Sequence, residues 1–241
     1  MTEKRFALVI GIDYRGFNCR LNGCEIDAGR FDTFLGSLGY QVTLMTQTSA
    51  VKNSALLPTK ANVIAKMNEI GNVGATHIAL FYAGHGTQLS SKDKSETDGL
   101  DECLVCLPVS GQGPTINDLL DDGKILSIVS KWQAKTFMMF DACHSGTICD
   151  LGFMLDRSGS SKKIANGYVN PSQNIICISA ADDSEVALET NGGGSATNKF
   201  FQCWTSGGRT VEHFCKAFST MGLQTPQLSS SKTIDTKLPL F

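Results

Sequence analysis

The chain has 241 residues, of which 41% are hydrophobic and 18% are charged, and its formal net charge is −2. These values predict a folded domain and exclude a broad basic surface of the kind that binds nucleic acid. No apolar run reaches the roughly 18 residues of a membrane span, and the amino terminus shows no signal-peptide cleavage site. The nine cysteines lack framework spacing, which favours reduced thiols. We therefore expect a cytoplasmic protein that binds neither membrane nor nucleic acid.

Continuous apolar runs alternate with amphipathic stretches along the chain. The apolar runs predict strands at 6–12, 42–45, 77–82, 136–140 and 174–179. Apolar residues at helical spacing predict helices at 24–38, after a cap at Thr59, at 123–132, around 196–205 and at 211–221. Between them, 87–102 is predicted to be an irregular surface segment, followed by a short strand or hairpin at 103–108, and the tail 224–241 to run extended. The alternation indicates an α/β domain with a mostly parallel sheet.

Side chains that can react chemically follow directly after two of the predicted strands. The run 77–82 is followed by AGHG at 83–86, and the run 136–140 by DACHSG at 141–146. Because parallel strands gather their carboxyl ends at one edge of a sheet, we expect one site there. Cys143 is the predicted nucleophile, His85 its base, and the backbone N–H groups of Gly86 and Cys143 the oxyanion hole. A Cys-x5-Arg phosphatase loop is disfavoured, because position 149 is Cys149.

These motifs resemble a known family. YAGHG at 82–86 and DACHSG at 141–146 put 143 − 85 = 58 positions between histidine and cysteine, which resembles the caspase-like cysteine peptidases, where that spacing is about 50. Asp141 replaces the caspase glutamine, and with LNGCEID at 21–27, DGLDE at 98–102 and QTPQLSSS at 224–231 the chain is similar to the metacaspases. The resemblance runs from Phe6 to the tail.

The resemblance implies a domain organisation. We expect a single caspase-like α/β domain over 1–241, with a mostly parallel central sheet and helices on both faces. Within it we expect a large catalytic portion at 1–156, a flexible linker at 157–170 and a small portion at 171–241. The sequence shows no amino-terminal Pro-rich or zinc-finger extension, so we expect a short form without a prodomain, acting as a monomer.

The resemblance also implies cleavage after Arg or Lys. Asp27 and Asp141 match the family's two pocket acids, and carboxylates accept a guanidinium or ammonium through charge-assisted hydrogen bonds. Cys24 matches a cysteine beside that pocket. Ala83 departs from the pattern, since family members often carry serine there. Self-cleavage in the basic linker is expected after Arg157, Lys162 or Lys163.

Calcium activation is the last implication. The positions that match the family's ion ligands are Asp101, Asp121, Asp122 and Asp150, and carboxylate oxygens are the ligands that Ca²⁺ prefers. The sequence thus predicts a calcium-dependent cysteine endopeptidase that acts on proteins or peptides through a Cys143–His85 dyad and a thioester acyl-enzyme. The alternative is a catalytically silent caspase-like protein with a regulatory or scaffolding role.

Overall fold

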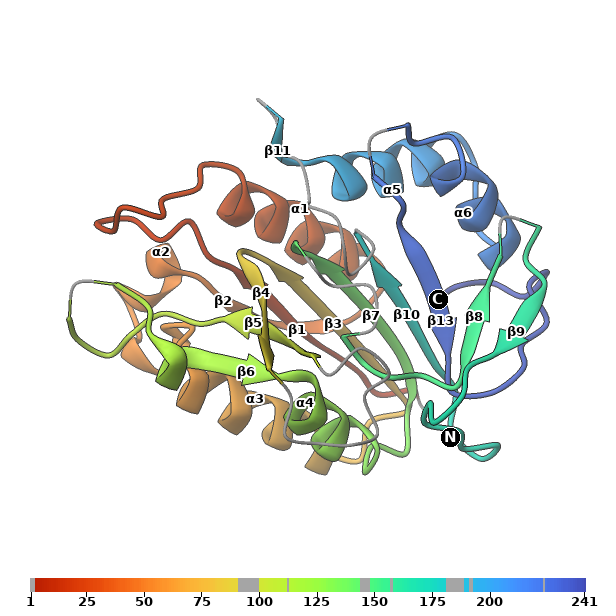
Figure 1. Cartoon of the computed structure of the whole chain (residues 1–241), viewed down its shortest axis with the longest axis horizontal. Helices are drawn as coiled ribbons and strands as arrows, with labels where there is room; N and C mark the ends of the chain where they lie inside the picture. Colours follow the sequence, from red (N-terminus) through yellow and green to blue (C-terminus); the bar gives the residue numbers. More distant parts are fainter. Residues whose placement is uncertain are drawn as a thin grey trace.

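The computed structural model describes residues 3–90, 100–111, 113–143, 148–156, 158–180, 189–190, 193–222 and 224–241, with the backbone alone at 189–190. An eight-stranded sheet runs through the domain in the order β2-β1-β3-β7-β10-β13-β8-β9 (Figure 1). The five parallel strands are β1 (Arg5–Gly11), β2 (Gln41–Met45), β3 (His77–Ala83), β7 (Lys135–Asp141) and β10 (Ile175–Ser179). All five coincide with predicted apolar runs, which confirms the mostly parallel sheet.

Three antiparallel pairings complete one edge of the sheet. The strands concerned are β13 (Gln227–Ser230), β8 (Phe153–Leu155) and β9 (Ser161–Lys163). The sequence did not predict β8 or β9, because three-residue strands leave too short an apolar pattern to detect. Since β9 lies inside the predicted linker, part of that linker is paired with β8. The flexibility predicted for 157–170 stays a prediction.

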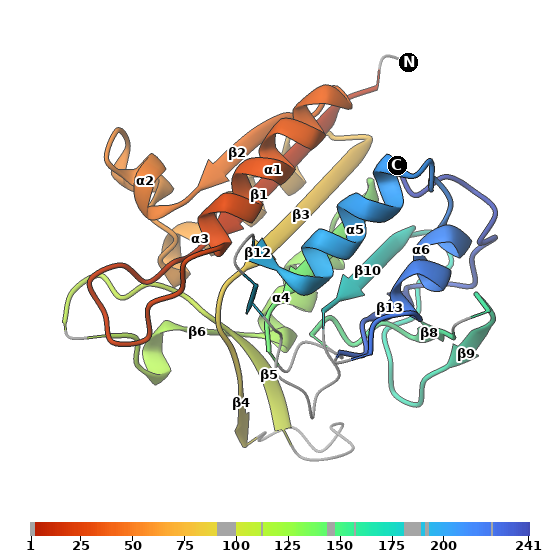
Figure 2. The same cartoon turned by 90° about the horizontal axis from the view of Figure 1, so that it is seen from above.

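Helices cover both faces of the sheet, as predicted. On one face lie α1 (Cys24–Ser37), α5 (Ser195–Thr205) and α6 (Val211–Phe218), and on the other α3 (Lys60–Asn72) and α4 (Asp122–Val129) (Figures 1 and 2). Each face has its own hydrophobic core, and alternate residues of β1 enter them: Leu8 and Ile10 one core, Ala7 and Val9 the other. Thr59 caps α3 by accepting the Asn62 N–H, as the sequence predicted. The remaining helical pieces are α2 (Gln47–Ala50), η1 (Ser54–Leu56) and η2 (Ile116–Asp118).

A second sheet corrects the prediction for 87–102. Strands β4 (Gly86–Ser90), β5 (Leu100–Val105) and β6 (Leu119–Asp121) form an antiparallel sheet of three strands. The expectation of irregular structure is therefore wrong at both ends of that range. Backbone pairing stabilises this hairpin while its polar, half-buried side chains carry no apolar alternation, so the periodicity failed to reveal it. A two-stranded pair, β11 (Glu189–Thr190) with β12 (Gly193–Gly194), precedes α5.

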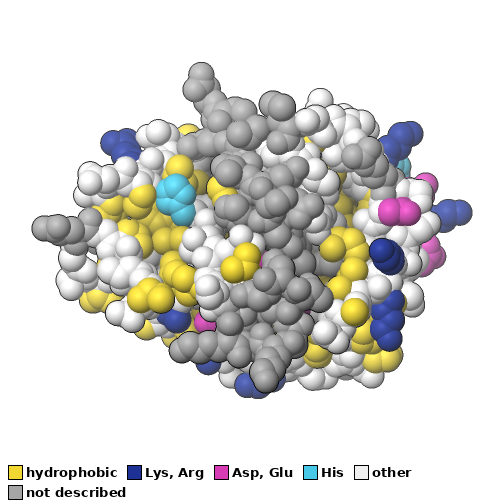
Figure 3. Space-filling view, in the orientation of Figure 1, with side chains coloured by type: hydrophobic (Ala, Val, Ile, Leu, Met, Phe, Trp, Pro, Cys, Tyr) yellow, Lys and Arg dark blue, Asp and Glu magenta, His cyan; other side chains and the backbone are white. Residues whose placement is uncertain are grey.

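Charged side chains lie mainly toward the margin of the face seen in Figure 3, and apolar side chains gather nearer its middle in the part that is described. Within the described ranges, no helix is long and apolar enough to cross a membrane.

Candidate active site

The two predicted catalytic segments meet at the carboxyl ends of neighbouring strands. β3 and β7 are parallel neighbours in which Ala83 pairs with Asp141, so His85 and Cys143 each follow two residues beyond the paired positions. A side chain at Gly86 would overlap the backbone carbonyl of Cys143, which places these two backbones in direct contact. Cys143 itself is half-buried. The structure therefore brings the predicted nucleophile, base and oxyanion-hole residues into one region.

Two buried tyrosines hold the backbone of His85. The Tyr14 hydroxyl accepts the His85 N–H at 2.9 Å, and the Tyr82 hydroxyl donates to the His85 carbonyl at 2.9 Å. The two hydroxyls lie 3.1 Å apart, and the Tyr14 ring centroid lies 4.7 Å from that of the imidazole. Burial raises the pKa of both phenols well above its usual range, so they stay neutral. The sequence did not reveal this pair, because two tyrosines 68 positions apart carry no motif.

The imidazole has a further partner in the loop after β1. Its Nε2 lies 2.7 Å from the backbone carbonyl oxygen of Cys19. A carbonyl can only accept a hydrogen bond, so Nε2 carries the proton in neutral His85 and Nδ1 is left as the basic nitrogen. Cys19 was also missed by the sequence reasoning, since a backbone acceptor leaves no residue-type signal.

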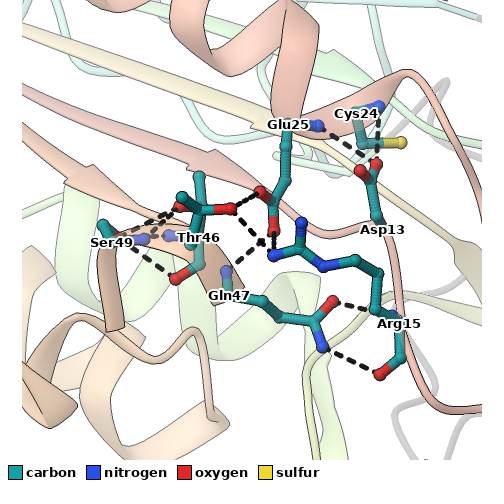
Figure 4. A network of polar contacts seen from close by, with 8 residues as sticks. Asp13, Arg15, Cys24, Glu25, Thr46, Gln47 and Ser49 are labelled. Atoms are coloured by element: carbon teal, nitrogen blue, oxygen red, sulfur yellow. Dashed lines mark hydrogen bonds and ion pairs between the residues drawn. The ribbon is translucent and has the colours of Figure 1, made fainter. Parts of the chain in front are cut away.

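A polar network anchors the loop that carries Cys19 (Figure 4). Asp13 Oδ1 accepts the backbone N–H groups of Cys24 and Glu25, at 3.0 and 3.2 Å, and so caps the amino terminus of α1. The Glu25 carboxylate accepts Arg15 Nη2 and the Gln47 N–H, both at 2.9 Å. The loop is thereby tied to α1 and to the residues after β2, which holds the Cys19 carbonyl in place.

The two predicted pocket acids also lie together, at the start of α5. Asp27 Oδ2 accepts the Gly194 N–H at 2.6 Å. Asp141 Oδ2 accepts the backbone N–H of Thr197 at 2.9 Å and its hydroxyl at 2.6 Å. Burial, reinforced by the neighbouring Asp141 carboxylate, raises the pKa of Asp27 to about 7. Burial likewise raises the pKa of Asp141. We call these two residues the acid pair.

Two glycines allow the backbone before α5 to lie directly against the acid pair. A Cβ at Gly193 would overlap the Asp27 carboxylate, and one at Gly194 would overlap that of Asp141. Gly193 also has φ +110°, which only glycine adopts without strain. Cys24, which the resemblance placed beside the pocket, is buried at the first position of α1, one turn before Asp27. The sequence did not reveal the contact between these glycines and the acid pair.

One cation that the sequence analysis did not select contacts the acid pair. Arg30 Nη1 donates to Asp27 Oδ1 at 3.0 Å and to Asn198 Oδ1 at 2.7 Å. Its guanidinium carbon lies 4.4 Å from the Phe201 ring centroid. Arg30 therefore links α1 to α5 across the acid pair.

Two of the four aspartates assigned to calcium lie close to each other. Burial raises the pKa of Asp122 to about 8, and the nearby Asp150 and Glu102 carboxylates add to that rise. The Glu102 N–H donates to Asp122 Oδ2 at 3.2 Å. Glu102 is itself buried and was not selected from the sequence. Mutually repelling carboxylates fit a divalent cation chemically. However, in the described part of the chain no three His, Cys, Asp or Glu side chains are arranged to hold a metal.

The other two predicted calcium ligands, Asp101 and Asp121, lie on the neighbouring strands β5 and β6. Asp121 Oδ1 accepts the Lys124 N–H at 2.7 Å and caps α4. Asp101 lies on β5, where burial raises the pKa of Cys103 to about 12 and the charges of Asp122, Asp121 and Asp101 add to that rise. Lys162 and Lys163 are exposed on β9, whereas Arg157 lies outside the described residues. The places of these residues leave metal binding and self-cleavage as predictions.

The chain is similar to known proteins along most of its length. The sequence model of the caspase domain matches residues 4–237. Similar curated proteins are Metacaspase-1 of Candida glabrata, 33% identical over 68% of this chain and 42% of its own length, and Metacaspase-1 of Saccharomyces cerevisiae, 32% identical over 67% and 38%. Metacaspase-1 of Ajellomyces capsulatus is 30% identical over 80% and 55%. The chain thus spans less than two thirds of the length of each relative.

Solved structures share the fold. Protein GSU0716 from Geobacter sulfurreducens superposes with a TM-score of 0.70 at 22% identity, covering 96% of this chain and 95% of that one. Caspase-1 from Spodoptera frugiperda superposes with a TM-score of 0.57 at 12% identity, covering 96% and 88%. The sheet order, the histidine and cysteine at adjacent strand ends and the family match agree: the chain belongs to the caspase-domain family and is of the metacaspase type.

Proposed function

We propose that the chain is a cysteine endopeptidase in which Cys143 is the nucleophile and His85 the base. The observation that carries this proposal is the contact between the ends of β3 and β7, with the His85 ring oriented by the Cys19 carbonyl. Nδ1 takes the thiol proton, and the thiolate attacks the substrate carbonyl carbon. The tetrahedral intermediate so formed collapses to a thioester as its carbon–nitrogen bond breaks and the protonated imidazole gives its proton to the departing amine. Water, deprotonated by the same imidazole, then releases the acid and restores the thiol.

Two backbone N–H groups are proposed to stabilise the developing oxyanion. Gly86 and Cys143 lie backbone against backbone, and the missing side chain at position 86 is what allows it. Donors held by the fold before the reaction need no reorganisation when charge develops on the substrate oxygen. A bulkier residue at 86 would separate these two donors.

We propose that the substrate carries Arg or Lys before the cleaved bond. The acid pair is buried close to the strand end that bears Cys143, since Asp141 precedes it by two residues. Buried carboxylates whose pKa is raised gain most from a cation, because an added positive charge offsets both their desolvation and their mutual repulsion. An acidic side chain would instead add a third negative charge.

Calcium dependence is proposed on the same electrostatic ground. Asp122 and Asp150, with Asp101 and Asp121 beside them in sequence or on the paired strand, would supply the carboxylate oxygens, and buried Glu102 would join them. A bound calcium ion supplies positive charge that offsets the repulsion among these carboxylates. It would stabilise the junction between β5, β6 and the segment after Cys143.

The test is hydrolysis of fluorogenic peptides that end in Arg, Lys or Asp, with and without millimolar calcium. We expect cleavage after Arg or Lys only, lost in Cys143→Ala and His85→Ala. Cys203→Ala and His213→Ala are matched controls, because they remove a half-buried thiol on α5 and an imidazole at the start of α6. Activity that survives Cys143→Ala, or that prefers Asp, contradicts the proposal.

A silent, scaffolding role is the second candidate. It is favoured by the acid pair, because three of its four carboxylate oxygens already accept hydrogen bonds from the protein itself. A folded, calcium-loaded sample that fails to react with an Arg-bearing chloromethyl ketone would support this role. Covalent labelling at Cys143 would exclude it.

Self-cleavage after Arg157, Lys162 or Lys163 is proposed as a consequence of basic specificity. Lys162 and Lys163 lie on the outer strand of the sheet, where a short strand can detach at little cost. Intact-mass measurement after calcium addition would reveal a cut, and Lys162→Ala with Lys163→Ala would remove it if either lysine is the site. No change in mass in an active enzyme would contradict it.

A further inference from the structure

We infer that Arg30 is an internal counter-ion of the acid pair, which reserves Asp27 for the protein, leaves Asp141 to meet the substrate's basic side chain and weakens the binding of that side chain. The inference rests on the proposed specificity for Arg or Lys. It assigns a specificity-determining role to a residue on α1 that has no part in the chemistry.

Both carboxylate oxygens of Asp27 are occupied by donors of the protein. Arg30 Nη1 donates to Oδ1 at 3.0 Å, and the Gly194 N–H donates to Oδ2 at 2.6 Å. Both carboxylate oxygens thus have a donor from the chain, and the Asp27 side chain is 1% exposed. An incoming guanidinium could pair with Asp27 only by sharing or displacing Arg30.

The described hydrogen bonds of Asp141 involve one of its two carboxylate oxygens. Its bonds from Thr197 both fall on Oδ2. A substrate donor can therefore use Oδ1 without breaking either bond. Within the described residues the two members of the acid pair thus differ: Asp27 is paired with a cation of the same chain, while the donors to Asp141 are neutral groups of α5.

The charge of Arg30 also acts on a cation bound at the acid pair. Two carboxylates and one guanidinium give the region a formal charge of −2 + 1 = −1 when both acids are ionised. Gly194 lies against both acids, since its N–H donates to Asp27 and a Cβ on it would overlap the Asp141 carboxylate. A substrate cation bonded to Asp141 would therefore also lie near Arg30, which contacts Asp27, and like charges at close range repel. Removing the Arg30 charge should therefore strengthen the binding of a basic peptide.

Arg30 is held in this position from three sides. Besides Asp27 it contacts Asn198 and the ring of Phe201, and its own side chain is 32% exposed. A flexible surface arginine would leave the acid when substrate arrives. One that is packed on an aromatic ring and bonded to α5 stays and competes.

The test measures binding without turnover. In the full chain carrying Cys143→Ala, calorimetry at pH 8.5 with calcium would follow acetyl-Gly-Gly-Arg-amide and the same peptide with norleucine for Arg. We expect Arg30→Gln to bind the Arg peptide about three- to tenfold more tightly than the Arg30 parent. The norleucine peptide should show no such gain, because it carries no charge.

Two further variants separate charge from structure. Arg30→Lys keeps the positive charge, so it should retain the weaker binding of the parent even if the contact with Asn198 is lost. Arg209→Gln is the matched control: Arg209 is also stacked on an aromatic ring, 3.9 Å from the Trp204 centroid, and its loss changes the net charge equally. It should leave the affinity unchanged. In an Asp27→Asn background, Arg30→Gln should bring a smaller gain.

The outcomes distinguish this inference from the proposed specificity. A parent that prefers the Arg peptide to norleucine, with Arg30→Gln unchanged or weaker, overturns the role of Arg30 alone. No preference in parent or variant overturns both. A preference that appears only in Arg30→Gln supports the role of Arg30 and shows that the native side chain masks the pocket.

Discussion

The Nε2 atom of His85 donates to the carbonyl oxygen of Cys19 across 2.7 Å. This contact joins the loop after β1 to the residue that follows β3, so the orientation of the imidazole depends on a segment 66 positions earlier in the chain. It also fixes the tautomer, because the carbonyl requires a donor. The basic nitrogen is then Nδ1.

Tyr14→Phe should reduce turnover by misplacing His85. The hydroxyl accepts the His85 N–H and donates to the Val105 carbonyl, and its removal leaves both backbone groups without that partner. We expect a loss of about 1–3 kcal/mol in the free energy of unfolding and a fall in kcat of about tenfold or more. Urea unfolding and peptide hydrolysis would measure these effects.

Tyr168→Phe is the control for that substitution. The Tyr168 hydroxyl donates to Gln173 Oε1 at 2.7 Å and accepts from Asn170, but it has no contact with His85. It should lower stability and leave kcat near that of the wild type. An equal fall in kcat for both variants would show that general destabilisation, and not the position of His85, is the cause.

Gly194→Ala should impair recognition of basic substrates. The added methyl would overlap the Asp141 carboxylate, and because Gly194 is the N-cap residue of α5, a shift of its backbone would also displace the start of that helix. We expect a rise in KM for Arg peptides of about tenfold and destabilisation of about 1–3 kcal/mol, as for overpacking. Gly29→Ala provides the comparison, because a Cβ there meets nothing within 4 Å and alanine favours the helix. A KM that is unchanged in Gly194→Ala would disprove this account.

The raised pKa of Asp27 predicts how stability depends on pH. Its pKa is about 7 in the folded chain against an ordinary value of 3.8, so between these values the folded state binds more protons than the unfolded state. Stability from this group is therefore complete below pH 4 and is lost as the pH rises to about 7, with a slope of at most about 1.4 kcal/mol per pH unit.

Asp27→Asn removes that titration. Unfolding by urea at pH 5, 6, 7 and 8 should show the wild type losing stability relative to the variant across this window. Because the comparison is a difference between two proteins, titrating groups that do not interact with Asp27 cancel. Parallel curves for the two proteins would mean that Asp27 does not titrate near neutrality.

Calcium should stabilise the folded chain if the proposed ligands hold it. Saturation to 100 times Kd would add about 2.7 kcal/mol to the free energy of unfolding. We expect Tm to rise with calcium, to return after chelation with EGTA, and to rise less with magnesium. Asp122→Asn and Glu102→Gln should each reduce the shift, and Asp118→Asn, which alters the cap of η2, should not. A wild-type Tm that does not change when calcium is added would contradict the proposal.

The sequence by itself determined the parallel strands, the main helices and the two catalytic motifs. Buried parallel strands are long apolar runs and surface helices have a 3.6-residue period, so both leave patterns within one short segment. The caspase-like fold and the metacaspase family followed from motifs that are likewise local. The hairpin formed by β4 and β5 was not predicted, because its stability comes from backbone pairing with few apolar side chains.

Only the tertiary structure decided how the site is completed. The Cys19 carbonyl and the Tyr14–Tyr82 hydroxyl pair act on His85 across long separations in the chain, and Arg30 meets Asn198 from another helix. Such contacts depend on how the sheet and helices pack, and a backbone carbonyl or a paired hydroxyl has no sequence signature. The candidate reactive residues could thus be predicted from the chain, whereas their orientation, protonation and charge balance arise from packing.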